Sequence, residues 1–132
     1  MDRPWYRWRS FWVHWALVLP ALMLGYLNRH SSTLFVVCMA PLLVDLLVAP
    51  VAVRPMVLAA KESRGMGGFL GTFSVVAGLG AMAVAAAFLV SSAGLLSLVV
   101  SAALGLYGLA SCWVGAQLVF RHPDDLDQVF PA

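Results

Sequence analysis

Charged residues are scarce in this chain of 132 residues. Eight Lys or Arg and six Asp or Glu make up 11% of the sequence, whereas soluble domains carry about 25% charged residues. Hydrophobic residues make up 62%, and the mean hydropathy is +0.91. A water-soluble domain could not bury so much apolar surface, so the composition excludes the soluble classes. The net charge of +2 gives no basis for binding nucleic acid.

Cysteines and catalytic motifs are equally sparse. The two cysteines, Cys38 and Cys112, each lie inside an apolar run, where cysteine commonly packs as a small hydrophobe. Their expected depths in a bilayer differ too much for the Cα separation of roughly 7 Å that a disulfide requires. No nucleophile elbow, phosphate-binding loop or pair of carboxylates is present. We therefore expect no enzymatic activity.

Metal and cofactor binding have little support in the sequence. The three histidines, His14, His30 and His122, fall on different helices or sides of the expected bilayer, so no metal-ligand spacing exists. A tetrapyrrole is the alternative, because a membrane histidine can bind haem iron axially. His14 is the intramembrane candidate, and a second axial histidine would have to be His30 at the opposite surface. We expect no cofactor, and interpret His14 as a structural residue near the membrane interface.

Four long apolar runs dominate the sequence. A helix of about 20 residues, rising about 1.5 Å per residue, spans roughly 30 Å of hydrocarbon, and each run is long enough to do so. The expected transmembrane helices cover residues 11–28, 34–53, 69–90 and 95–120. The basic start and the first run together resemble a secretory signal peptide. We reject that interpretation because the run ends without a small-residue cleavage pattern and further apolar runs follow.

The connections between the runs predict two antiparallel hairpins. The segments 28–33 and 91–94 are too short to be more than tight turns. Residues 54–68 are expected to form a basic cytoplasmic loop, whose first half is an alternative short interfacial helix. Residues 121–132 form a polar cytoplasmic tail. The predicted fold is therefore an all-α integral membrane bundle of four transmembrane helices in a single domain.

The basic residues predict the orientation of this bundle. With four crossings, both termini and the central loop share one side of the membrane. That side holds Arg3, Arg7, Arg9, Arg54, Lys61, Arg64 and Arg121, whereas the opposite side holds only Arg29. Because cytoplasmic loops carry an excess of Lys and Arg, both termini are expected in the cytoplasm. The expected location is the plasma membrane, in bacteria the inner membrane.

Asp45 is the most unusual residue of the apolar runs. An ionised Asp near the centre of a membrane helix costs about 2.5 to 3.5 kcal/mol, so such residues usually face a partner or a polar cavity. Pro41 and Pro50 flank it and predict an irregular helix. Counted along the first two helices, His14 lies at a similar depth, so a hydrogen bond between His14 and Asp45 is possible. The candidate intramembrane polar site comprises Asp45, His14 and Pro41.

Small residues indicate where helices pack, because close approach rather than the hydrophobic effect drives association in lipid. The run at 95–120 carries a seam of small residues at heptad spacing. The expected packing residues are Ser101, Gly105, Gly108, Cys112 and Gly115. Tyr107 and Gln117, the other sizeable polar residues of this run, are attributed to packing and to the membrane interface. The run at 69–90 is the expected partner.

Two functions are compatible with these features. The favoured one is a non-catalytic accessory or structural subunit that packs in a larger membrane complex. It rests on the missing catalytic residues and on the small-residue faces. The alternative is a homo-oligomeric transporter or channel that uses Asp45. The expected partners are the lipid bilayer and either other membrane subunits or copies of the chain itself.

Overall fold

The computed structural model describes residues 4–129, and this part of the chain is helical almost throughout. The long helices are α1 (Pro4–Leu27), α2 (Ser32–Glu62), α3 (Arg64–Ser91) and α4 (Leu95–Phe120). All four are long and apolar enough to span a membrane. The prediction of an all-α bundle with four such helices is confirmed.

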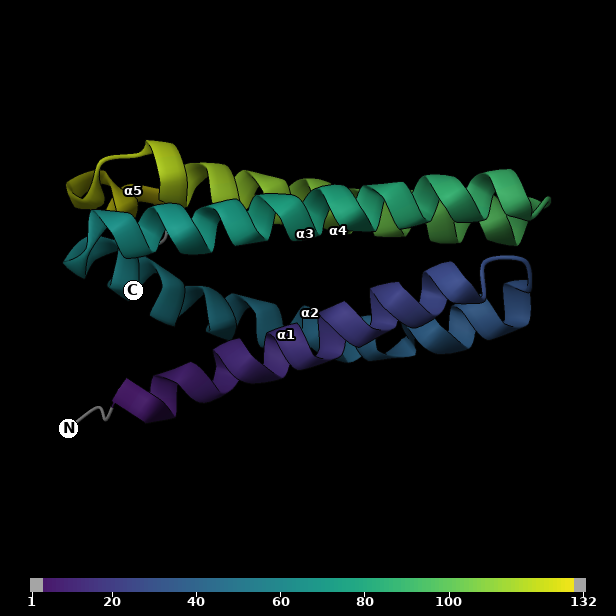
Figure 1. The fold of residues 1–132 in the computed structure, drawn as a ribbon, viewed down its shortest axis with the longest axis horizontal. Helices are drawn as coiled ribbons and strands as arrows, with labels where there is room; N and C mark the ends of the chain where they lie inside the picture. The colour runs from purple at the N-terminus through teal and green to yellow at the C-terminus, as the bar shows by residue number, and fades with distance from the viewer. Residues whose placement is uncertain (1–3, 130–132) are drawn as a thin grey trace.

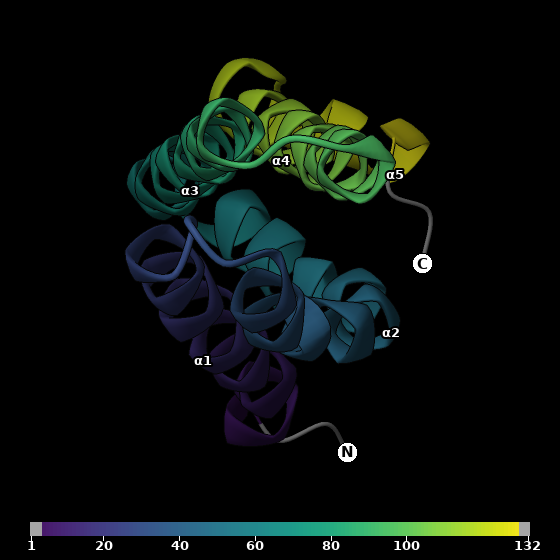
Figure 2. The same cartoon turned by 90° about the vertical axis from the view of Figure 1, so that its right-hand side faces the viewer.

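The helices form two antiparallel hairpins, α1 with α2 and α3 with α4 (Figure 1). Packing is more extensive within each hairpin than between them. Figure 2 shows the two hairpins as two layers. The short α1–α2 and α3–α4 connections lie at one end of the bundle, here called the loop end. The α2–α3 junction and the outermost described residues lie at the other, the junction end (Figure 1). At the loop end Gly94 has φ +117°, a conformation that favours glycine.

The predicted loop at 54–68 is wrong, because α2 and α3 extend through almost all of it. Only Ser63 separates the two helices. Its backbone N–H bonds to the carbonyl of Ala59 at 2.9 Å, and its Oγ accepts a hydrogen bond from the N–H of Met66 at 3.3 Å. One serine therefore ends α2 and caps the start of α3, which makes a longer loop unnecessary.

Proline does not end α2, although the helix contains Pro41, Pro50 and Pro55. A proline leaves the carbonyl four residues earlier without its usual donor. For Pro55 that carbonyl belongs to Val51, and the Ser10 hydroxyl of α1 donates to it at 3.4 Å. Along its junction-end third, α2 turns toward α3 (Figure 1). The sequence prediction stopped the helix at residue 53 because it treated Arg54 and Pro55 as the start of a loop.

The described part of the expected polar tail at 121–132 includes two short helical segments. Pro123–Asp125 form a 3₁₀ turn, η1, and Leu126–Val129 form a short helix, α5. The Leu126 side chain is completely buried, and η1 contacts α2. The end of the described chain is thus docked at the junction end rather than extended away from it.

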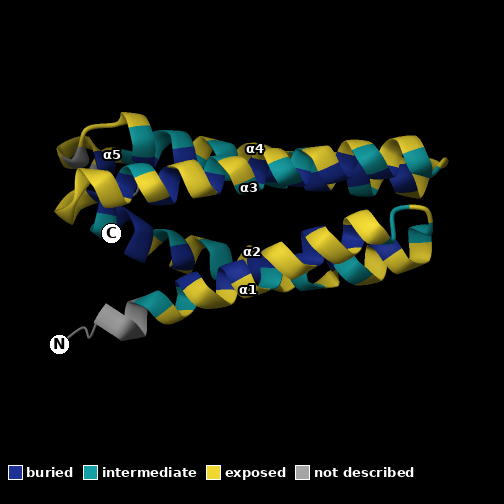
Figure 3. Ribbon diagram, viewed as in Figure 1, coloured by how far each residue is buried: buried dark blue, intermediate teal, exposed yellow. Residues whose placement is uncertain are grey.

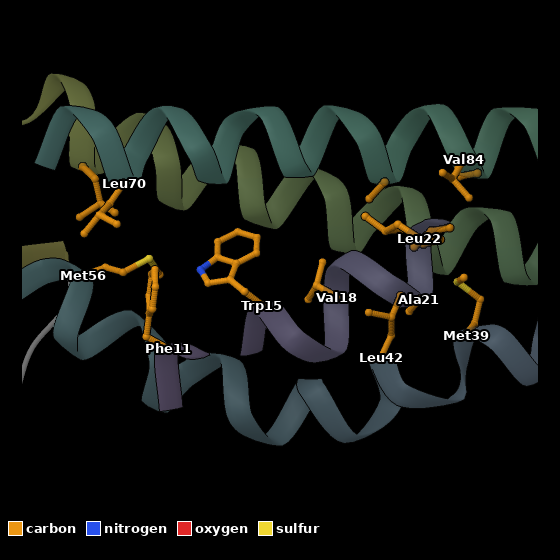
Figure 4. Packing of buried hydrophobic residues seen from close by; sticks show 14 of the residues in the cluster. Phe11, Trp15, Val18, Ala21, Leu22, Met39, Leu42, Met56, Leu70 and Val84 are labelled. Atoms are coloured by element: carbon orange, nitrogen blue, oxygen red, sulfur yellow. The ribbon is translucent and has the colours of Figure 1, made fainter. Parts of the chain in front are cut away.

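Apolar side chains from all four long helices form the buried core of the bundle. Figure 4 shows Phe11 and Trp15 of α1 beside Met56 of α2 and Leu70 of α3. Nearer the loop end, the rings of Phe35 and Phe88 stack at 3.8 Å between centroids, and both are fully buried. The exposed residues lie on the outer faces of the helices (Figure 3). The two hairpins are therefore joined by large apolar side chains along much of their length.

The α3–α4 contact is built on glycines. A Cβ placed on Gly78 would lie 2.5 Å from the Gly108 carbonyl oxygen, and one on Gly108 would lie 2.6 Å from that of Gly78. Gly71 and Gly115 face one another in the same way. Backbones this close leave no room for a side chain, which is how small residues permit tight packing.

Gly105 is an exception among the predicted packing residues. A Cβ there would meet nothing within 4 Å, so Gly105 does not line the contact with α3. Ser101 is buried, and Cys112 donates its S–H to the carbonyl of Val75 at 3.5 Å.

Candidate functional site

Asp45 is the centre of a buried polar cluster. It is 0% exposed, although it lies in a helix whose neighbouring residues are almost all apolar. His14 Nδ1 of α1 lies 2.7 Å from its Oδ1. A carboxylate only accepts hydrogen bonds, so Nδ1 carries the hydrogen and donates it. The contact between His14 and Asp45 that the sequence indicated is present.

Tyr107 of α4 completes the cluster. Its hydroxyl donates to Oδ2 of Asp45, so each carboxylate oxygen has a donor from a different helix. Among the described residues, His14 and Tyr107 are the hydrogen-bond partners of Asp45. The sequence interpretation missed Tyr107 because it explained this residue by packing and by the membrane interface. The cluster joins α1, α2 and α4, and the Tyr107 bond crosses from one hairpin to the other.

The three residues lie at one level along the bundle. His14 comes thirteen residues before the end of α1 at Leu27, and Asp45 thirteen residues after the start of α2 at Ser32. Tyr107 comes twelve residues after the start of α4 at Leu95. At about 1.5 Å per residue, each lies roughly 18 to 20 Å from the loop end. The hydrogen-bonded chain therefore runs across the bundle and not along it.

Aromatic side chains enclose the His14 side of the cluster. The rings of His14 and Trp15 meet edge to face with centroids 4.6 Å apart, and Trp15 meets Phe73 of α3 in the same way at 4.6 Å. The indole Nε1 of Trp15 is buried without a hydrogen-bond partner. The surroundings of His14 are therefore mainly apolar, which strengthens its bond to Asp45.

Pro41 lies one turn before Asp45 on α2 and is half-buried. Without an N–H it leaves the carbonyl of Val37 without its usual helical donor. It makes no hydrogen bond to the cluster, so the structure brings together His14 and Asp45 but gives Pro41 no direct part.

Metal ligands do not converge in the described residues. No group of three or more His, Cys, Asp or Glu residues could hold a metal ion there. His30 lies in the α1–α2 connection at the loop end, far from His14. Cys38 and Cys112 are both free thiols. Two axial histidines from this one chain therefore could not bind the same tetrapyrrole.

No family model, curated protein or solved structure matches this chain.

Proposed function

We propose that this protein is a non-catalytic accessory subunit of a larger membrane complex, with four transmembrane helices and both termini in the cytoplasm. The proposal rests on Asp45, the carboxylate in the middle of the bundle, because its hydrogen bonds are made within the chain. Asp45 is fully buried, and both of its oxygens are bonded within the chain. Its role is to hold helices together.

The membrane assignment is supported by four long apolar helices and by the charge distribution. The described basic residues except Arg29 lie toward the junction end, which becomes the cytoplasmic side under the positive-inside rule. The 31 residues of α2 exceed the roughly 20 that a bilayer requires, so its last turns, with Lys61, reach the headgroup layer. In bacteria this membrane is the inner membrane. Reporter fusions at both termini and at the α3–α4 connection test the orientation.

The geometry of the cluster favours a structural role over conduction. A proton relay across a membrane needs groups at successive depths, whereas His14, Asp45 and Tyr107 share one level. Burying a carboxylate in lipid is costly unless it is paired, and these two donors reduce that cost. The cluster thereby fixes α1 and α2 against α4.

The outer faces of the helices are apolar and suit both lipid and neighbouring subunits. Leu47 of α2 and Val90 of α3 are 80% and 88% exposed. The exposed side chains of the four described transmembrane helices supply no catalytic group. An accessory subunit fits such a surface, since it contributes packing and leaves the chemistry to its partners.

The test is gentle detergent extraction at native expression, followed by purification of this chain and measurement of the native mass. The proposal predicts other membrane subunits in fixed stoichiometry. Recovery of this chain alone, as a defined oligomer, would contradict it.

A second function is a homo-oligomeric transporter or channel that uses Asp45. The observation in its favour is that Tyr107 adds a third ionisable group to the chain of hydrogen bonds. This function predicts that Asp45→Asn abolishes an ion-dependent flux in proteoliposomes while assembly is retained. Equal flux in wild type and variant would exclude it.

A further inference from the structure

We propose that Nε2 of His14 is the point at which a partner subunit binds, through a hydrogen-bond donor on one of its transmembrane helices. This inference rests on the proposed accessory function and assigns a residue to it. Asp45 fixes the tautomer of the ring, because Nδ1 donates to the carboxylate. In the neutral imidazole, Nε2 is then an unprotonated acceptor.

This nitrogen has no partner within the described residues. Three side-chain polar atoms there are both buried and unpaired, namely Trp15 Nε1, Ser97 Oγ and Ser101 Oγ. His14 Nε2 is not among these atoms, and the His14 side chain is 10% exposed, so the ring is not fully enclosed by the chain. At the surface of a transmembrane bundle such an acceptor can gain a hydrogen bond from a donor outside the chain.

The depth of His14 decides what kind of donor fits. His14 lies roughly 20 Å from the loop end and, at about 1.5 Å per residue, about 8 Å below Arg9, just inside the cytoplasmic edge of the hydrocarbon layer. Acyl chains supply no donor at this level. Neighbouring hydroxyls of the chain itself are engaged, since Tyr107 donates to Asp45, and Ser10, one turn from His14 on α1, donates to the carbonyl of Val51. A polar side chain on a neighbouring transmembrane helix supplies what is missing.

The small exposed fraction of the His14 side chain favours a single hydrogen-bond donor over a flat macrocycle as its ligand. A tetrapyrrole bound axially at Nε2 would need a broad accessible face around the ring. Instead the imidazole is nine-tenths covered and lies against Trp15. One hydroxyl, amide or indole N–H fits that exposure.

The test uses His14→Asn, because the amide of asparagine takes the place of Nδ1 and keeps the donor to Asp45 while Nε2 is lost. We expect the variant to fold, with an unchanged helical circular dichroism spectrum. Recovery of the partner subunit with the purified chain should fall at least tenfold. His14→Gln, which restores an amide near the position of Nε2, should recover part of the binding.

A second measurement does not depend on the fold of a His14 variant. A photoreactive benzoylphenylalanine at Leu17, one turn from His14 on α1, should cross-link to a transmembrane segment of the partner. The same probe at Leu47, exposed on the outer face of α2, is the matched control and should cross-link less.

Several outcomes would overturn the inference. They are full partner recovery with His14→Asn, a Leu17 cross-link only to a differently tagged second copy, and a visible tetrapyrrole spectrum lost in His14→Asn. With the first of these the accessory function would stand and only the role of His14 would fail. If wild type brought down no partner subunit, both proposals would fail together.

Discussion

The Tyr107 hydroxyl donates to Oδ2 of Asp45 and thereby joins α4 to α2 across the interface between the two hairpins. The other oxygen of Asp45 accepts from His14 of α1. A single buried carboxylate therefore connects three of the four long helices. Elsewhere in the described residues the Ser74 hydroxyl donates to the Met56 sulfur at 3.9 Å, and the Ser92 hydroxyl donates to the Arg29 carbonyl at 3.1 Å at the loop end. The cluster around Asp45 is thus the carboxylate-centred polar connection between the hairpins.

Removal of the Tyr107 hydroxyl should loosen the two hairpins. We expect Tyr107→Phe to lower the free energy of unfolding by about 0.5 to 2 kcal/mol, because Asp45 loses one of two donors in an apolar interior. Unfolding in a detergent titration measures this change. Tyr26→Phe is the control, since Tyr26 is exposed on α1. Equal stability of the two variants would argue against the bond.

Two glycines of α4 should respond differently to the same substitution. Gly108→Ala places a Cβ 2.6 Å from the Gly78 carbonyl oxygen and should destabilise the α3–α4 hairpin by about 1 to 3 kcal/mol. Gly105→Ala meets nothing within 4 Å and should be neutral, or stabilise the helix by up to about 1 kcal/mol. The same unfolding titration compares them. A loss of stability in Gly105→Ala as large as that in Gly108→Ala would contradict the packing described.

Ser63, between α2 and α3, should stabilise the start of α3 through its side-chain oxygen. Ser63→Ala removes the acceptor for the Met66 N–H and should cost about 1 kcal/mol of stability. Ser63→Asp keeps a capping oxygen and should retain most of the wild-type stability. Hydrogen exchange of the first-turn amides of α3 reports the local effect. Unchanged protection in Ser63→Ala would show that the cap is dispensable.

Docking of the C-terminal helix should depend on Leu126. We expect Leu126→Ala to release α5 and to increase cleavage of the tail by protease added to the junction end. Gln128→Ala, an exposed position on the same short helix, is the matched control and should cleave like wild type. Similar cleavage rates for both variants would mean that Leu126 does not anchor the tail.

Hydropathy was sufficient to predict the four helices and their pairing, because a transmembrane run is long and nearly free of charge. It failed at the α2–α3 junction. Arg54, Pro55 and the later charged residues have the composition of a loop, yet the helix continues through them. The reason is local hydrogen bonding: Ser10 compensates the carbonyl freed by Pro55, and Ser63 alone serves as the turn. Neither contact is visible in a composition profile.

The candidate site was partly predictable for a similar reason. His14 and Asp45 could be paired because both are conspicuous in apolar runs and lie at one depth. Tyr107 lies at the same depth, and counting from the start of α4 would have found it. Tyrosine is common in membrane helices, however, so its presence in the sequence did not indicate a hydrogen bond to Asp45. Gly105 was mistaken for a packing residue because heptad spacing does not reveal which side of a seam the neighbouring helix covers.

The coupling energy between Asp45 and Tyr107 tests the central claim most directly. Unfolding free energies of wild type, Asp45→Ala, Tyr107→Phe and the double variant complete a double-mutant cycle. If Asp45 holds the hairpins together, the two residues should be coupled by about 0.5 to 3 kcal/mol. Strictly additive effects, combined with loss of an ion flux in Asp45→Asn, would contradict a structural role and favour transport.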